Sequence, residues 1–170
     1  MKTYVMIPTY NERENIGNLI QEILNLKISD LRIVVVDDNS PDGTSVVVKD
    51  LSREHQEVEL LLRTTERGRG SAGIAGFKHA LEHGADCIIE MDADFSHHPK
   101  YIPSMLAAIQ NADMVIGSRF ISGGEDVNRG IMRKVITILA GIYVRVLLGL
   151  KIKDVSSGYR CFKRKVLEAI

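Results

Sequence analysis

Two carboxylates one residue apart are the clearest candidates for chemistry in this sequence. Asp92-Ala93-Asp94 directly follows the apolar run Cys87–Met91, which is typical of a buried strand. Carboxylates at this spacing can turn toward one cation, and Mg²⁺ and Mn²⁺ prefer oxygen ligands and keep open positions for substrate phosphates. The pattern predicts a divalent-metal site, with an acidic turn that caps the next helix as the alternative.

A second carboxylate pair, Asp37-Asp38, follows the apolar run Arg32–Val36. Carboxylates at a strand end commonly accept hydrogen bonds from a ribose or from base N–H groups. A turn in which Asp and Asn side chains bond the local backbone explains the same residues equally well. These residues by themselves leave both nucleoside binding and a simple turn open.

The segment after the first apolar run offers an aromatic ring beside polar groups. Tyr10 can stack on a base, and Thr9 or Glu12 can then form a hydrogen bond to the edge of that base. Taken alone, the segment is better explained as the start of a helix, with Asn11 as its N-cap and Glu14 as the reciprocal partner.

A glycine-rich loop, Gly68-Arg69-Gly70-Ser71-Ala72-Gly73, matches the dinucleotide fingerprint G-x-G-x-x-G. The preceding strand is expected to end near Arg63, so residues 64–67 intervene where the fingerprint needs an immediate tight turn. The sequence also supplies two carboxylate pairs where a dinucleotide site asks for one ribose-binding carboxylate. We therefore expect the loop to approach a diphosphate or a sugar, and a nicotinamide-dependent oxidoreductase is the weaker hypothesis.

Two arginines further along the chain are candidates for binding an anion. Arg119 follows the expected strand Met114–Ile116, so it shares a sheet edge with the carboxylate pairs. Guanidinium groups bind phosphate bidentately, and Arg119 with Arg133 can clamp an anionic acceptor. Solvated surface arginines are the alternative. The adjacent His97 and His98 cannot easily ligate one ion together, and we expect one of them to pack or to cap a helix.

Short apolar runs alternate along the chain with segments of helical length. The expected strands are Tyr4–Ile7, Arg32–Val36, Val58–Leu62, Cys87–Met91 and Met114–Ile116. The expected helices are Glu12–Leu26, Thr44–Arg53, Ser71–His83 and Lys100–Gln110. Strands without polar alternation are buried on both faces, which indicates an α/β fold with a mostly parallel central sheet flanked by helices. The loops after the strands then share the edge where α/β folds bind ligands.

Composition and charge narrow the class of protein. A chain of 170 residues with 45% hydrophobic residues suits one globular domain, and its net charge of zero gives no argument for a nucleic-acid partner. Residues 1–126 carry 12 Lys and Arg against 20 Asp and Glu, a balance of −8, whereas residues 127–170 carry 10 against 2, a balance of +8. The first part can hold a cation, and the second can meet phosphates or an anionic membrane face.

Other features bear on the setting of the chain. It has 2 Cys without zinc-binding spacing, and no signal peptide is visible, which favours a reducing compartment. The apolar segment Val135–Leu150 is too short and too charged to span a bilayer comfortably. A core helix, an interfacial membrane helix and a helix covered by further sequence all remain open for it. Because the chain ends within a segment of helical pattern, we expect a C-terminal truncation.

Six segments occur in an order that resembles a known family: IPTYNERENI, VVDDNSPDGT, ERGRGSAGIAGFKHAL, MDADFSHHPKYIP, GSRF and DVSSGYRCF. Together they resemble the family 2 glycosyltransferases of GT-A fold, and within these the dolichol-phosphate (polyprenyl-phosphate) mannosyltransferases. The resemblance covers nearly the whole chain and implies a single GT-A, Rossmann-like catalytic domain. The sequence departs from the family at residues 67–70, where relatives often have a Leu- or Lys-containing loop, and at residues 154–157, where a Pro/Thr-containing segment is more usual.

The resemblance also implies roles for individual residues. The guanosine of GDP-mannose would be bound by Pro8, Tyr10, Glu12, Val36 and Asp38. The metal, Mg²⁺ or Mn²⁺, would be held against the diphosphate by Asp92 and Asp94, with the backbone of Ala93 nearby. The phosphate of the lipid acceptor would be received by Arg119, Arg133 and Thr137. Of these, the groups expected to act in catalysis are Asp92, Asp94, Arg119 and Arg133.

The implied reaction is inverting transfer of mannose from GDP-mannose to dolichyl or polyprenyl phosphate, which yields a lipid-phosphate β-mannose. No general base is required, because a phosphate monoester has a second pKa of about 6 and is already a nucleophile at neutral pH. A transferase that uses UDP-glucose or another UDP-sugar and a non-catalytic nucleotide-binding domain remain open. Residues 1–126 would form the donor and metal half. Residues 127–170 would form the acceptor part, peripherally associated with the cytoplasmic face of a membrane.

Overall fold

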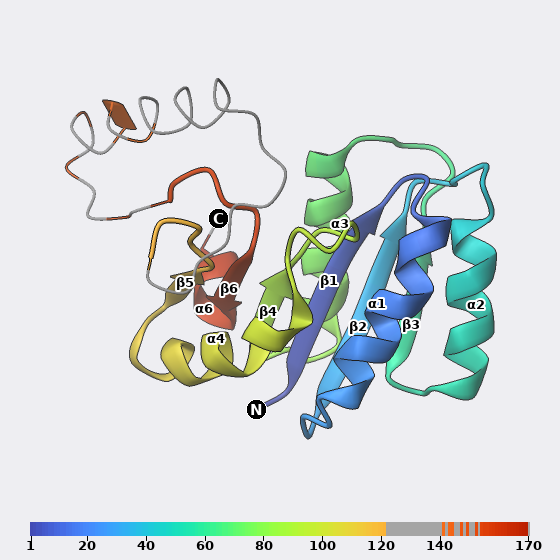
Figure 1. The fold of residues 1–170 in the computed structure, drawn as a ribbon, viewed down its shortest axis with the longest axis horizontal. Coiled ribbons are helices and arrows are strands. Elements are labelled where there is room, and N and C mark those ends of the chain that lie inside the picture. The colour runs from blue at the N-terminus through green and yellow to red at the C-terminus, as the bar shows by residue number, and fades with distance from the viewer. Residues whose placement is uncertain are drawn as a thin grey trace.

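Within the residues that the structure describes, six strands form one sheet at the centre of the molecule. The computed structural model describes residues 1–121, 141, 143, 144, 147, 149, 152 and 154–169. The strands are β1 Thr3–Thr9, β2 Leu31–Asp37, β3 Val58–Leu62, β4 Cys87–Glu90, β5 Met114–Ile116 and β6 Arg160–Lys163. Their spatial order is β3-β2-β1-β4-β6-β5, as Figure 1 shows.

The sheet is mostly parallel. Strands β1 to β4 run in one direction, and β6 runs antiparallel to both β4 and β5. In the centre, Val5 of β1 pairs with Ile33 of β2 and with Ile89 of β4, so branched apolar side chains stand in register across the sheet. The parallel direction brings the loops after β1, β2 and β4 to the same edge.

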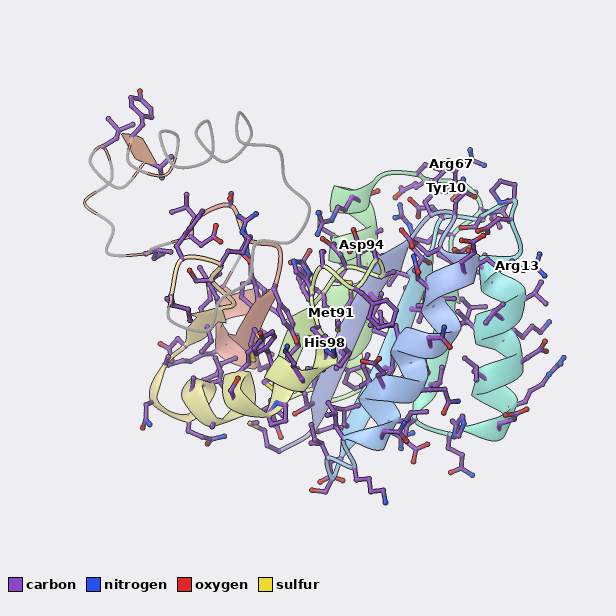
Figure 2. The ribbon with its side chains drawn as sticks, in the orientation of Figure 1. Tyr10, Arg13, Arg67, Met91, Asp94 and His98 are labelled. Atoms are coloured by element: carbon purple, nitrogen blue, oxygen red, sulfur yellow. The ribbon has the colours of Figure 1, made fainter. Side chains whose placement is uncertain are left out.

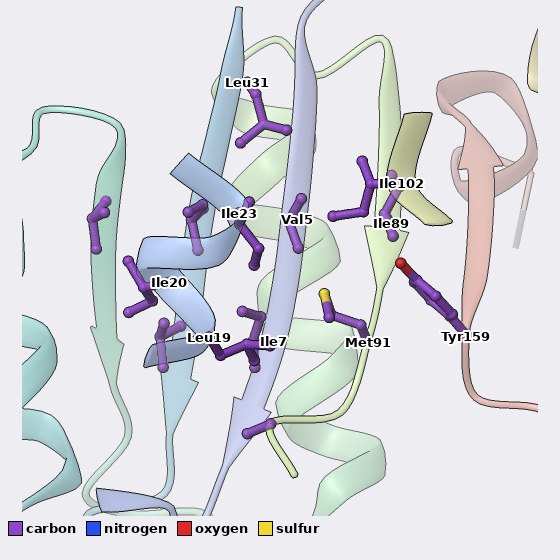
Figure 3. Packing of buried hydrophobic residues seen from close by; sticks show 14 of the residues in the cluster. Val5, Ile7, Leu19, Ile20, Ile23, Leu31, Ile89, Met91, Ile102 and Tyr159 are labelled. Atoms are coloured by element: carbon purple, nitrogen blue, oxygen red, sulfur yellow. The ribbon is translucent and has the colours of Figure 1, made fainter. Parts of the chain in front are cut away.

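Helices cover both faces of the sheet. One face carries α1 Arg13–Asn25, α2 Thr44–Glu54 and α4 Ile102–Ala108, with 3-10 turns at Pro99–Tyr101 and Ile109–Asn111. The other face carries α3 Arg69–Glu82 and α6 Arg164–Leu167. On α1, apolar residues at helical spacing face the sheet, and Leu19, Ile20 and Ile23 pack in one cluster with Val5 and Ile7 (Figure 3).

Helix α3 approaches the sheet closely because it presents glycine there. A Cβ atom on Gly76 would collide with Cγ of Met6 and would lie 2.9 Å from Cγ2 of Val36. The close packing places the start of α3, at Arg69, beside the carboxyl edge of the sheet, where it contacts the segment after β4.

The architecture expected from the sequence is confirmed, and two local expectations are corrected. Strand β6 was not among the expected strands; it pairs with β4 and β5, which lie far away in the sequence. The expectation that Asn11 caps α1 is wrong, because the N-cap position is Glu12, and the N–H of Arg13 in the first turn donates to Oδ2 of Asp42 at 3.0 Å. Asn11 has a φ of 60°, and its N–H donates to Oγ of Ser40 at 3.0 Å.

The helix expected over Lys100–Gln110 is a short α-helix between two 3-10 turns. Among the described helices, none has both the length and the apolar character needed to cross a membrane. Most of the apolar segment Val135–Leu150 lies outside the described residues.

Candidate active site

The loops at the carboxyl edge of the sheet enclose a pocket of ≈ 570 Å³. This volume lies in the usual range for small-molecule sites. Figure 2 shows Tyr10, Arg67 and Asp94 at this end of the molecule. The pocket is lined by Pro8, Thr9, Tyr10, Glu12, Asp38, Arg67, Gly68, Arg69, Ala72, Asp92, Ala93 and Asp94.

The two adjacent aspartates after β2 have different roles. Asp37 is fully buried, and its carboxylate accepts hydrogen bonds from Oγ1 of Thr9 at 2.9 Å and from Oγ of Ser40 at 2.6 Å. Asp38 lines the pocket, and its Oδ2 accepts the N–H of Gly68 at 2.7 Å. Its Oδ1 faces Nη1 of Arg63 at 2.9 Å, outside hydrogen-bond geometry. The turn interpretation therefore fits Asp37, and the ligand-facing interpretation fits Asp38.

An exposed aromatic ring forms part of the pocket wall. Tyr10 is 49% exposed, and the guanidinium of Arg67 lies 5.7 Å from the centre of its ring, which is a cation–π distance. The neighbouring carboxylate of Glu12 accepts a hydrogen bond from Nδ2 of Asn15 at 3.0 Å. An exposed ring at a pocket wall can stack on a planar ligand such as a base.

Asp92 and Asp94 both line the pocket, as the metal hypothesis requires. Oδ1 of Asp92 accepts a hydrogen bond from Nη2 of Arg69 at 2.5 Å. Burial raises the pKa of Asp94, but hydrogen bonds from the side chain and the N–H of Ser96 outweigh it, so this pKa lies below its usual value. Two carboxylates that face a pocket fit a hard divalent cation. The described residues contain no cluster of three or more His, Cys, Asp or Glu side chains that could hold a metal ion.

The histidines after this segment hold its backbone. Nδ1 of His97 accepts the N–H of Asp92 at 2.8 Å, and its ring stacks on Tyr159 with centroids 4.9 Å apart. Burial lowers the pKa of His97, which favours the neutral ring that this acceptor role needs. Nδ1 of His98 accepts the N–H of Lys100 at 3.2 Å. The expectation that one histidine packs or caps is confirmed, because His97 packs and His98 caps.

Arg119 is held by a buried carboxylate. Its Nε and Nη2 each donate to Asp154 at 2.8 Å, and Nη2 also donates to Oγ of Ser156 at 2.8 Å. Burial raises the pKa of Asp154, but the hydrogen bonds from Arg119 outweigh it, so this pKa lies below its usual value. A second pocket of ≈ 320 Å³, lined partly by Ser118 and Asp154, lies beside this pair.

The structure brings most of the expected donor-site residues into one pocket: Pro8, Tyr10, Glu12, Asp38, Asp92, Ala93 and Asp94. Val36 does not belong to the pocket lining. It is fully buried, and its side chain packs under α3. Arg119 is not part of the pocket lining. Arg133 and Thr137 lie outside the described residues.

Sequence reasoning did not identify the ionic partners within the site. Arg63 faces Asp38, and Arg69 donates to Asp92, although each pair is separated by more than twenty residues. The glycine-rich loop was expected to approach a diphosphate or a sugar, but nothing in the local pattern assigned its arginines to carboxylates. The only available signal was that all these residues follow strand ends.

Comparison with known proteins yields a family and close relatives. The model of the family described as "Glycosyl transferase family 2" matches residues 4–170. The chain is 42% identical to the undecaprenyl-phosphate mannosyltransferase of Micrococcus luteus, with 100% of this chain and 70% of that protein covered. It is 41% identical to the polyprenol monophosphomannose synthase of Mycolicibacterium smegmatis, with 99% and 64% covered. It is 42% identical to the dolichol-phosphate mannosyltransferase of Pyrococcus furiosus, with 100% and 48% covered.

Solved structures share the fold. A mannosyltransferase from Pyrobaculum calidifontis in complex with GDP-Man and Mn²⁺ has a TM-score of 0.64 at 21% identity, with 99% of this chain and 46% of that chain covered. The mannosyl-3-phosphoglycerate synthase from Rubrobacter xylanophilus has a TM-score of 0.73 at 20% identity, with 98% and 54% covered. At such identities the likeness supports the fold alone, and the expected GT-A class is confirmed.

Proposed function

The chain belongs to glycosyl transferase family 2, and from this premise we propose that it moves mannose from GDP-mannose to dolichyl or polyprenyl phosphate. The names of the three sequence relatives join mannose with a polyprenol, undecaprenyl phosphate or dolichol phosphate. The chain spans 70%, 64% and 48% of the lengths of these relatives.

One observation carries the proposal: a single pocket joins nucleoside-binding side chains to a pair of carboxylates. At one end, Tyr10 offers a ring for the base. Asp38 also lines this end, and its carboxylate is held by Arg63 and by the N–H of Gly68. At the other end, Asp92 and Asp94 can hold a divalent cation. A pocket with an aromatic ring at one end and two carboxylates at the other suits a nucleoside diphosphate, whose base would contact the ring and whose phosphates would contact the metal.

Positive groups line the pocket between these two ends. Arg67 and Arg69 belong to its lining, and so does the start of α3 at Gly68. Helix N-termini favour anions, and guanidinium groups bind phosphate oxygens bidentately. We assign the donor diphosphate to this stretch of the wall.

Charge explains the chemistry of the proposed transfer. A phosphate oxygen of the acceptor attacks the anomeric carbon from the face opposite the nucleotide, the bond from that carbon to the diphosphate breaks, and GDP leaves with the electron pair. When bound, Mg²⁺ or Mn²⁺ supplies Lewis-acid neutralisation of the leaving diphosphate. The acceptor phosphate needs no general base, since its second pKa is about 6. In-line attack gives inversion.

The acceptor phosphate is assigned to Arg119, Arg133 and Thr137. Arg119 is suited to this task because Asp154 fixes the plane of its guanidinium, and because an arginine stays protonated beside a nucleophilic phosphate. We further propose that residues 127–170, with their balance of +8, associate peripherally with the cytoplasmic face of a membrane. That face would present the lipid phosphate to the pocket.

Calorimetric titration of GDP and of UDP, each with and without Mn²⁺, tests the donor. We expect tight binding of GDP that depends on Mn²⁺, and weak binding of UDP. Preference for UDP would retain the fold and the mechanism but would change the sugar. A structural neighbour, the glucosyl-3-phosphoglycerate synthase from Mycobacterium tuberculosis, was solved with Mn²⁺ and UDP, which makes this the second candidate.

Transfer is tested separately. Radiolabelled GDP-mannose and polyprenyl phosphate are expected to give a labelled lipid product when Mn²⁺ is present and none when EDTA is added. Nucleotide binding without a labelled lipid product would instead identify a non-catalytic nucleotide-binding domain.

A further inference from the structure

Arg69 lies at the meeting point of the glycine-rich loop and the carboxylate pair. It is the first residue of α3, and its Nη2 donates to Oδ1 of Asp92 at 2.5 Å. The same nitrogen lies 4.0 Å from Oε1 of Glu90, at the end of β4. The side chain is 56% exposed, so this guanidinium is not a buried structural ion. It covers the carboxylate that the proposed function assigns to the metal.

The residues around Arg69 leave room for its guanidinium beside Asp92. A Cβ atom on Gly158 would lie 2.8 Å from Nη2 of Arg69, so the guanidinium occupies space that any other residue at 158 would take. Arg69 also lines the pocket, in the stretch of wall to which the proposed function assigns the diphosphate, and its side chain is exposed enough to move. Its neighbour Arg67 lines the same pocket but lies over the ring of Tyr10.

From this geometry we infer that Arg69 is a resident counter-ion of the metal site: it neutralises Asp92 while no cation is bound, and it passes to the donor diphosphate when the metal takes its place. The inference rests on the proposed function for the identity of the site. A cation that reaches Asp92 alone must displace Arg69. A cation that arrives with a nucleoside diphosphate gives Arg69 a new partner, so metal and nucleotide bind cooperatively.

The first part of the inference is that Arg69 competes with the metal for Asp92. It is tested by titrating the whole chain with Mn²⁺ alone and monitoring free Mn²⁺ by its electron paramagnetic resonance signal. Arg69→Ala is expected to bind Mn²⁺ at least about fivefold more tightly than the unchanged chain when nucleotide is absent, the lower end of usual coupling factors. Arg53→Ala is the matched control, because it removes the same charge from an exposed position on α2, outside the pocket lining. We expect it to change the affinity less than about twofold, as exposed charges are screened.

The second part of the inference is that Arg69 binds the diphosphate once the metal occupies Asp92. Adding GDP to the same titration tests it. GDP should tighten Mn²⁺ binding in the unchanged chain and in Arg53→Ala, but much less in Arg69→Ala, because that variant lacks both the competitor of the metal and a guanidinium that binds the diphosphate. An equal or weaker Mn²⁺ affinity of Arg69→Ala without nucleotide would overturn the inference, since a merely structural role predicts that outcome. The inference would also be overturned if neither the unchanged chain nor the variants bound Mn²⁺.

The two proposals fail separately. The nucleotide-free titration reports on Arg69 and Asp92 whichever nucleotide the protein prefers. If Arg69→Ala gains Mn²⁺ affinity but GDP does not bind, the counter-ion role stands and the GDP-mannose assignment falls. Circular dichroism spectra that coincide for the three proteins would show that the comparison is made between equally folded chains.

Discussion

Asp37 and Asp38 are adjacent residues of the same type, but they differ in their surroundings and in their roles. The carboxylate of Asp37 accepts hydrogen bonds from the hydroxyls of Thr9 and Ser40, whereas Asp38 lines the pocket and faces Arg63 and the N–H of Gly68. The pair Asp92 and Asp94 differs in that both side chains line the pocket. Position relative to distant partners, rather than residue type, therefore decides which carboxylates meet a ligand.

Asp94→Ala is expected to lower metal-dependent transfer at least about 100-fold, because a bound metal supplies several kcal/mol of charge stabilisation and Asp94 is one of the two carboxylates proposed to hold it. Turnover with saturating Mn²⁺ measures the effect. Asp50→Ala is the control, since this exposed carboxylate pairs with Arg53 on α2, outside the pocket. Transfer by Asp94→Ala at the unchanged rate would remove this residue from the metal site.

Asp154→Asn is expected to lower the free energy of unfolding at pH 7 by about 1–3 kcal/mol, because Arg119 loses a charged hydrogen-bond partner. The pKa of Asp154 lies below its usual value in the folded protein, so its contribution is present above about pH 4, the unfolded value, and is lost as the pH falls further. Urea unfolding at pH 7 and at pH 3 should thus show a difference that shrinks in acid.

The matched control for this prediction is Asp113→Asn. That carboxylate is exposed and pairs with Lys165 at 2.7 Å, and surface pairs contribute little to stability. A difference between the unchanged chain and Asp154→Asn that stays constant from pH 7 to pH 3 would show that the carboxylate charge is not the source of the stabilisation.

At the scale of elements, the site depends on how closely α3 packs on the sheet. The start of this helix supplies Gly68 and Arg69 to the pocket, and Gly76 lets the helix approach β1 and β2. The parallel strands contribute the rest of the walls, because their carboxyl ends share one edge. A displacement of α3 therefore changes the pocket without altering any residue in it.

Gly76→Ala is expected to lower the free energy of unfolding by about 1–3 kcal/mol, since the new methyl group collides with Met6 and Val36. Gly73→Ala in the same helix is the control. Its Cβ atom would lie 3.9 Å from the nearest atom, Cε of Met6, and alanine is favoured over glycine in helices, so stability should hold or rise by up to about 1 kcal/mol. Equal urea midpoints for the two variants would contradict the close packing.

At the scale of the whole molecule, charge divides the chain. Residues 1–126 carry a balance of −8 and contain Asp92 and Asp94, the proposed metal ligands, whereas residues 127–170 carry +8. Such an asymmetry orients a protein at an anionic surface, with its basic part toward the lipid. The proposed acceptor is a lipid phosphate, so this orientation would bring donor and acceptor together.

Vesicle sedimentation tests the proposed membrane contact. The chain is expected to bind vesicles that contain anionic lipid, to bind neutral vesicles weakly, and to dissociate as salt is raised. Joint substitution Lys151→Glu and Lys153→Glu should weaken binding at least about tenfold, at about 1 kcal/mol per basic residue near the surface. Lys27→Glu with Lys49→Glu changes the net charge equally in the first part and should have little effect. Equal weakening by both pairs would rule out an oriented contact.

The sequence by itself determined the elements and the chemical classes present. Strands β3 and β5 have the expected bounds, and the carboxylates of the metal hypothesis follow β4 as expected. These features are local: apolar periodicity marks a strand, and a polar group after it marks the sheet edge. Six family segments in order then specified the family. Strand β6 was missed because a four-residue run becomes a strand only through partners elsewhere in the chain.

Only the tertiary structure decided which residue does what. In the folded chain, Asp37 is buried, Asp38 lines the pocket, and the side chain of Val36 packs beneath α3. Arg69 donates a hydrogen bond to Asp92. In each case the deciding contact comes from a segment distant in sequence, so the local sequence does not predict it. Propensity and periodicity act over a few residues and specify elements, whereas the roles of the charged groups depend on distances that exist only after the sheet has assembled.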